Sequence, residues 1–70
     1  MKVSTRNTLM GKVKKIQHGS VNSEILIELP GGLELVSIIT KSSAEHLELQ
    51  IGKEVMALIK ATNVMIATND

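Results

Sequence analysis

Three short segments of the chain each combine one cation with small hydroxyl and amide side chains. Such a set suits a small, multiply charged oxyanion, because the cations balance its charge while neutral donors fill the remaining hydrogen-bonding positions around it. The alternative is that these segments are ordinary polar loops, since Ser, Thr and Asn are also common turn residues. The segments are Ser4-Thr5-Arg6-Asn7, Thr40-Lys41-Ser42-Ser43 and Lys60-Ala61-Thr62-Asn63.

Two of these segments follow apolar runs that are expected to be buried strands. Lys60 comes directly after Ala57-Leu58-Ile59, so its side chain either extends to solvent or meets an anion. Thr40 ends another apolar run just before an expected helix, whose first backbone N–H groups lack partners within the helix and favour an anion. Alternatively, the serines that cap this helix accept those N–H groups themselves.

The sequence gives little support to catalysis or to a metal centre. There is no cysteine, which excludes disulfides, thiolate ligands and a cysteine nucleophile. The two histidines, His18 and His46, do not have the spacing of a zinc site and are expected at the surface. No arrangement resembles a catalytic triad, a carboxylate pair or a phosphate-binding glycine motif. We therefore expect no enzymatic activity and no catalytic cofactor.

Length and composition indicate a small folded protein that needs support from a second copy. Seventy residues form one domain, expected over 1–70, and so short a chain buries only about 60% of its unfolded surface. Because disulfides and metal sites are missing, oligomerisation is the remaining common way to stabilise it. No signal peptide and no run of roughly 20 apolar residues is present, so we expect a cytoplasmic protein without a membrane partner.

The alternation of apolar and polar residues predicts an all-β fold. A short helix, expected to begin at Ser42 with Glu45 as its capping-box partner and to end at Gly52, separates the third strand from the fourth. This order is typical of an OB-like, five-stranded β-barrel with one short helix between strands three and four. The expected strands cover residues 9–17, 21–29, 33–40, 54–60 and 64–67.

Local irregularities refine this expectation. A bulge at Lys14-Lys15 would place Val13 and Ile16 on the same face of the first strand. Gly19 and Pro30-Gly31-Gly32 mark the two turns that follow the first and second strands. The strands over 33–40 and 54–60 are apolar on both faces, so both faces are expected to be covered, which is more than one small barrel can achieve.

A barrel of this kind often binds nucleic acid, yet the composition argues against it here. OB-folds usually hold single strands by stacking bases on aromatic side chains in a basic groove. This chain has no Phe, Tyr or Trp, and its formal net charge is +1. We therefore expect no specific binding of nucleic acid.

Four motifs, in order, resemble the molbindins, which are single Mop domains also called molybdenum-pterin-binding proteins. The resemblance covers the chain from about Ser4 to Ala67, and its specificity lies in the order and spacing of the motifs. The motifs are Ser-x-Arg-Asn at 4–7, Gly-x-Val-Asn-x-Glu at 19–24, Gly-Lys-Glu-Val at 52–55 and Leu-Ile-Lys-Ala-x-x-Val-Met at 58–65.

The resemblance implies a non-enzymatic protein that binds molybdate, and also tungstate, at subunit interfaces of a hexamer built as a trimer of dimers. Such proteins store molybdenum in the cytoplasm. The main alternative is a regulatory module that senses molybdate and acts on a partner protein, because the same domain also occurs in molybdate-responsive regulators. A third class, a nucleic-acid-binding barrel, is disfavoured by the missing aromatic residues.

Site residues transfer one by one from the matched motifs. Arg6 and Lys60 would contact the oxyanion by charge, and the Ala61 backbone N–H would add a neutral donor. A second class of oxyanion site is associated with the loop over Gly19, Ser20, Val21 and Asn22. The molybdate-binding set implied by the resemblance is Ser4, Thr5, Arg6, Thr40, Ser43, Lys60 and Ala61.

Overall fold

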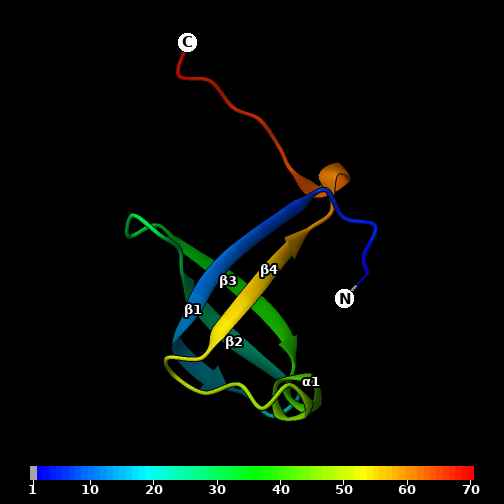
Figure 1. Ribbon diagram of the computed structural model, residues 1–70, viewed down its shortest axis with the longest axis vertical. Coiled ribbons are helices and arrows are strands. Elements are labelled where there is room, and N and C mark those ends of the chain that lie inside the picture. The colour runs from blue at the N-terminus through cyan, green and yellow to red at the C-terminus, as the bar shows by residue number, and fades with distance from the viewer. Residues whose placement is uncertain (1) are drawn as a thin grey trace.

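The structure is a computed structural model that describes residues 2–70; Met1, the first residue of the expected 1–70 domain, lies outside them. Four strands form one antiparallel sheet in the order β3-β2-β1-β4, which curls into an open half-barrel (Figure 1). The elements are β1 (Asn7–His18), β2 (Asn22–Glu28), β3 (Glu34–Thr40), the helix α1 (Lys41–His46), β4 (Glu54–Ile59) and the 3-10 turn η1 (Ala61–Asn63). The all-β class and the helix between the third and fourth strands are confirmed.

The long strand β1 joins the two halves of the sheet, because it pairs with β2 on one side and β4 on the other. Its register with β2 shifts between Val13 and Lys15, so Lys14 is the bulged residue, as predicted. The bulge turns the side chain of Val13 into the core, where it is 1% exposed, and Ile16 packs beside it. The bulge therefore produces the curvature that the half-barrel needs.

The two predicted turns form, each for a different reason. Gly31 and Gly32 have φ angles of 89° and 86° in the β2–β3 hairpin, a conformation that glycine adopts without steric cost. Gly19 does not have a positive φ. A Cβ at Gly19 would lie 2.9 Å from the carbonyl oxygen of Asn22, so this position requires glycine because the backbone turns back closely on itself.

The helix begins earlier and ends earlier than predicted. Its N-cap is Thr40, whose Oγ1 accepts the backbone N–H of Ser43, and the expected capping box of Ser42 with Glu45 is wrong. Thr40 remains extended because it still pairs with β2, so its side chain is the first that can reach a free N–H of the helix. The helix ends at His46, well before Gly52.

The core lies inside the curl of the sheet and under α1. After the helix, Leu49 packs against this core, whereas Leu47 remains 53% exposed. The buried members are Val13, Ile25, Ile27 and Ala44, surrounded by the half-buried Ile16, Leu29, Leu35, Ile39, Leu49, Val55 and Ala57.

The outer faces of the edge strands are uncovered in one chain. Val36 and Ile38 on β3 are 56% and 67% exposed, and Met56 and Leu58 on β4 are 43% and 42% exposed. The expectation that both faces of these strands are covered is therefore not met within a single chain.

The predicted fifth strand is wrong for the isolated chain. Residues 64–67 belong to no helix or strand, and the segment after η1 extends away from the half-barrel (Figure 1). Val64, Met65 and Ile66 are 52%, 93% and 91% exposed. An isolated strand has no partner for its backbone hydrogen bonds, so its apolar pattern alone cannot make it pair. Among the described residues, no helix is long and apolar enough to cross a membrane.

Candidate oxyanion-binding site

The two terminal cationic segments meet at one end of the sheet. In the β1–β4 ladder, Asn7 pairs with Ile59, so the next residues outward on the two strands are Arg6 and Lys60. Two side chains hold the segments together at the carbonyl oxygen of Ile59: the Thr5 Oγ1 hydroxyl donates to it at 2.7 Å and the Asn7 Nδ2 amide at 3.2 Å. Ser4, Thr5, Arg6, Lys60 and Ala61 are hereafter called the Arg6–Lys60 cluster.

Both cations of this cluster are free to meet an anion. Within the described residues, the ion pairs are those of Lys14 with Glu28 and Glu34, and none involves Arg6 or Lys60. Like charges placed on neighbouring strands repel each other. The first residue beyond each strand at this end of the ladder is therefore a cation without an acidic partner among the described residues.

The turn η1 adds a backbone donor beside Lys60. Hydrogen bonds inside the turn begin with the N–H of Asn63, which donates to the carbonyl oxygen of Lys60 at 2.8 Å. Ala61 is the first residue of the turn, so its N–H has no acceptor within the turn. Lys60 is the N-cap of the turn, and its ammonium group forms no ion pair within the described residues.

The remaining hydroxyls lie in a second cluster at the other end of the sheet, where β3 passes into α1. Thr40 Oγ1 donates to Ser43 Oγ at 2.7 Å and accepts from the Ser43 N–H at 3.1 Å. This arrangement uses the hydroxyl hydrogen of Thr40 and leaves that of Ser43 free to donate. Thr40, Ser43 and the loop 19–22 are hereafter called the Thr40–Ser43 cluster.

The loop over 19–22 belongs to this second cluster by direct pairing. Asn22 pairs with Thr40 in the β2–β3 ladder, and the N–H of Lys41 donates to the carbonyl oxygen of Val21 at 2.8 Å. A cavity of about 300 Å³ lies beside the loop and is lined by Glu24 and His18, with no lysine or arginine. In one chain this cavity lacks the positive charge that an oxyanion needs.

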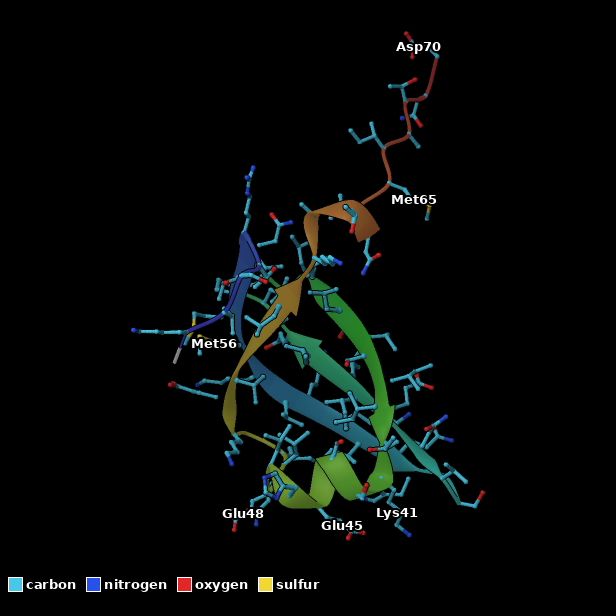
Figure 2. The ribbon with its side chains drawn as sticks, turned by 90° about the vertical axis from the view of Figure 1, so that its right-hand side faces the viewer. Lys41, Glu45, Glu48, Met56, Met65 and Asp70 are labelled. Carbon is cyan, nitrogen blue, oxygen red and sulfur yellow. The ribbon has the colours of Figure 1, made fainter. Side chains whose placement is uncertain are left out.

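One chain does not bring the two clusters together. Asn7 and His18 are the opposite ends of β1; the Arg6–Lys60 cluster extends the first end, and the Thr40–Ser43 cluster lies beside the second. Figure 2 shows the same separation, with Lys41 at one end of the molecule and Met65, just beyond η1, at the other. Of the predicted set, Ser4, Thr5, Arg6, Lys60 and Ala61 are brought together, whereas Thr40 and Ser43 are not joined to them.

Sequence reasoning missed the structural role of Asn7. Asn7 is the last residue of the Ser-x-Arg-Asn motif, so the motif could have drawn attention to it. Its role becomes visible only in the structure, where its side-chain amide donates to the carbonyl oxygen of Ile59 and fixes the end of β4. The histidines lie where no metal-ligand role is apparent: His18 Nδ1 is 2.6 Å from the buried Ser23 Oγ, and His46 ends α1. No group of three or more potential metal ligands occurs within residues 2–70.

Comparison with known proteins identifies the domain. Residues 3–66 match the TOBE domain family. A probable molybdenum-pterin-binding protein of Haemophilus influenzae is 47% identical over 66 residues, which are 94% of this chain and 96% of that protein.

Two solved structures have the same fold. A molybdate-binding protein from Sporomusa ovata has a TM-score of 0.92 and 41% identity, covering 97% of this chain and all of that one. The cytoplasmic molybdate-binding protein ModG, solved with molybdate bound, has a TM-score of 0.89 and 43% identity, covering 93% of this chain and 46% of that one. These likenesses confirm the predicted OB-like Mop fold, and the chain belongs to the TOBE domain family and, within it, to the molybdenum-pterin-binding, or Mop, proteins.

Proposed function

We infer that this protein binds molybdate, and tungstate as its close analogue, without catalysing a reaction, and that it stores molybdenum in the cytoplasm. The observation that carries this inference is the β1–β4 register, which places Arg6 next to Lys60 without an acidic partner. The molybdate-binding relatives from Sporomusa ovata and ModG support the choice of oxyanion. Residues 1–70 act in this proposal as one Mop domain.

The chemistry of the Arg6–Lys60 cluster suits a tetrahedral dianion. Two cations balance its two charges, and the Arg6 guanidinium can donate two parallel hydrogen bonds to neighbouring oxygens. The Ser4 hydroxyl and the Ala61 N–H supply neutral donors. Thr5 also fixes the segment that carries Arg6, because its hydroxyl hydrogen is donated to the carbonyl oxygen of Ile59 and is therefore not free for the ligand.

A second copy of the chain would complete this shell of donors. Thr40 and Ser43 lie at the far end of the same chain, so their hydroxyls reach the oxyanion only if they come from a neighbouring subunit. The exposed apolar faces of β3 and β4 provide the surface that subunits of such an oligomer would bury. The family resemblance sets the expected number at six, arranged as a trimer of dimers.

The loop Gly19–Asn22 is proposed as part of a second class of oxyanion site. Its cavity contains a carboxylate and no cation in one chain. Binding there therefore requires positive charge or backbone donors from neighbouring subunits. We expect this second site to be occupied at higher ligand concentration than the Arg6–Lys60 cluster.

Calorimetric titration with molybdate, tungstate and sulfate at one ionic strength tests the proposal. Charge-assisted hydrogen bonds contribute about 1.5–3 kcal/mol each, and a handful of them, less the costs of ordering and desolvation, gives roughly the −8 kcal/mol of a micromolar Kd. We expect molybdate and tungstate to bind at micromolar concentration or below and sulfate to bind more weakly. Equal affinity for all three, or no binding of molybdate, would contradict the proposal.

Two companion measurements address the partners. Native mass spectrometry should show an oligomer, expected to be a hexamer, that gains mass in steps of whole molybdate ions. Fluorescence anisotropy with labelled single-stranded DNA at physiological salt should show no specific binding. Sub-micromolar DNA binding that persisted in excess molybdate would favour the nucleic-acid reading instead.

A further inference from the structure

One ring nitrogen of His18 is bound to a buried hydroxyl, which leaves the other nitrogen for a ligand. His18 is the last residue of β1 and pairs with Ser23 near the start of β2. Its Nδ1 lies 2.6 Å from the Ser23 Oγ, and Ser23 is 0% exposed, whereas the residue His18 as a whole is exposed. Because Nδ1 is already engaged, Nε2 is the ring nitrogen that a ligand can meet.

The burial of Ser23 determines which nitrogen of His18 carries the hydrogen. A hydroxyl can donate or accept, so either group could be the donor in this bond. Within residues 2–70, His18 Nδ1 is the hydrogen-bond partner that the structure gives to the Ser23 Oγ. If Nδ1 carried the hydrogen, the hydroxyl hydrogen of Ser23 would have no acceptor in a fully buried position, which is costly. The Ser23 hydroxyl therefore donates to Nδ1, and the neutral ring carries its hydrogen on Nε2.

His18 lines the cavity beside the loop Gly19–Asn22. The volume of this cavity, about 300 Å³, is roughly ten times the share of one water molecule in the liquid, which is ample for an oxyanion of five atoms. Glu24 is the charged side chain of its lining, and the residues that pair with Glu24 in the two ladders, Gln17 and Ile38, are uncharged. An oxyanion in this cavity would therefore meet one donor from His18 and one repelling carboxylate from Glu24.

The backbone beside His18 is held as firmly as its ring. The N–H of Gly19 donates to the carbonyl oxygen of Asn22 at 2.7 Å and closes the turn that follows β1. A donor that is already oriented, with its hydrogen on the correct nitrogen, loses little further freedom when a ligand arrives. The neutral ring brings no charge, so the positive charge that an oxyanion needs here still has to come from neighbouring subunits.

We propose that His18 Nε2–H donates a hydrogen bond to the oxyanion beside the loop Gly19–Asn22, and that Ser23 is the positioning residue that keeps the hydrogen on this nitrogen. The inference rests on the second class of oxyanion site proposed above and assigns its side-chain donor. Glu24 has the opposite effect, because its carboxylate disfavours an anion in the same cavity. His18 and Glu24 thus set the affinity of the second site without acting on the Arg6–Lys60 cluster, which lies at the other end of β1.

NMR of the full chain with ¹⁵N-labelled histidine tests the tautomer before any ligand is added. The chain has two histidines, so a His46→Gln variant assigns the signals of His18. At a pH where both rings are neutral, the ¹⁵N shifts distinguish a ring nitrogen that carries hydrogen from one that does not. We expect the hydrogen of His18 on Nε2 in the parent and a larger share of the Nδ1–H form in Ser23→Ala. The inference is overturned if the parent carries this hydrogen on Nδ1, or if Ser23→Ala leaves the tautomers unchanged.

Calorimetric titration with molybdate tests the contact itself. His18→Leu removes the donor and should weaken the second class of sites about 10- to 100-fold, whereas His18→Gln keeps an N–H donor and should recover part of that loss. Glu24→Gln removes the repelling charge and should strengthen the second class. We expect all three variants to fill the first class of sites within about twofold of the parent.

The outcomes separate this inference from the proposed function. If His18→Leu fills the second class of sites as tightly as the parent, or if the parent has only one class, then His18 is not a donor to the oxyanion, while the proposed function stands. If the parent binds no molybdate at all, the proposed function fails and the inference fails with it. The NMR signals of His18 add an independent check, because Nε2 should shift only over the molybdate concentrations that fill the second class.

Discussion

Replacing Lys60 by alanine is expected to weaken molybdate binding while leaving the empty protein as stable as before. In the structure, Lys60 follows β4 directly, is exposed, and forms no ion pair with any described residue. Arg6, which is equally without an ion pair, lies just beyond the same end of the β1–β4 ladder, where Asn7 pairs with Ile59. The substitution therefore removes a charge that has no stabilising partner until an anion arrives.

The two effects have opposite signs and can be estimated separately. Like charges on adjacent strands cost about 0.2–1 kcal/mol, so the free energy of unfolding of the ligand-free variant should be unchanged or higher by up to that amount. Truncating one partner of a charge pair in a binding site costs about 2–4 kcal/mol. That cost corresponds to a molybdate Kd raised about 30- to 900-fold.

The assay is calorimetric titration of the parent, Lys60→Ala and the control Lys15→Ala. Lys15 is an exposed lysine beside the bulge of β1, so its removal makes the same change in net charge away from both clusters. We expect Lys15→Ala to bind molybdate within about twofold of the parent. If Lys60→Ala also binds like the parent while its oligomer stays intact, then Lys60 is a solvated surface lysine and the Arg6–Lys60 cluster is not the site.

Three further predictions follow from single contacts. Asn7→Ala removes an amide that fixes the end of β4. Molybdate affinity should fall by about three- to tenfold, which is the equivalent of one neutral hydrogen bond. An unchanged affinity in calorimetric titration would show that Asn7 does not position the cations. Gly11→Ala would place a Cβ 2.6 Å from Ile27 Cγ2, so the free energy of unfolding, measured with denaturant, should fall by about 1–3 kcal/mol. Ser23→Ala removes the fully buried hydroxyl that lies 2.6 Å from His18 Nδ1. At matched protein concentration, the free energy of unfolding should fall by about 0.5–1.5 kcal/mol. An unchanged midpoint of denaturant unfolding would contradict the importance of this bond.

Much of the sheet is determined by local sequence. The alternation of residues predicts four of the strands to within a few positions, and the bulge at Lys14 follows from the spacing of Val13 and Ile16. The hairpin at Gly31 and Gly32 follows from the left-handed conformation that glycine readily adopts. These features are visible in the sequence because each depends on residues that are neighbours along the chain.

The helix start and the fifth strand required tertiary information. Thr40, and not Ser42, caps α1 because its pairing with Asn22 holds it extended at the point where the helix begins. Residues 64–67 have the pattern of a strand, yet a strand exists only where another strand accepts its hydrogen bonds. Pattern reports which face of a segment is apolar, and it does not report whether a partner is within reach.

The candidate site, like the fold, depends partly on local sequence and partly on tertiary structure. The sequence by itself determined the chemical character of the donors, because a cation among hydroxyl and amide side chains is suited to an oxyanion wherever it lies. Only the tertiary structure decided that Arg6 and Lys60, 54 positions apart along the chain, lie side by side, while Thr40 and Ser43 lie at the opposite end. The physical reason is the register of the antiparallel ladders: β1 pairs its first residues with the end of β4 and its last with the start of β2, so convergence in space depends on pairings between residues that are distant in the sequence.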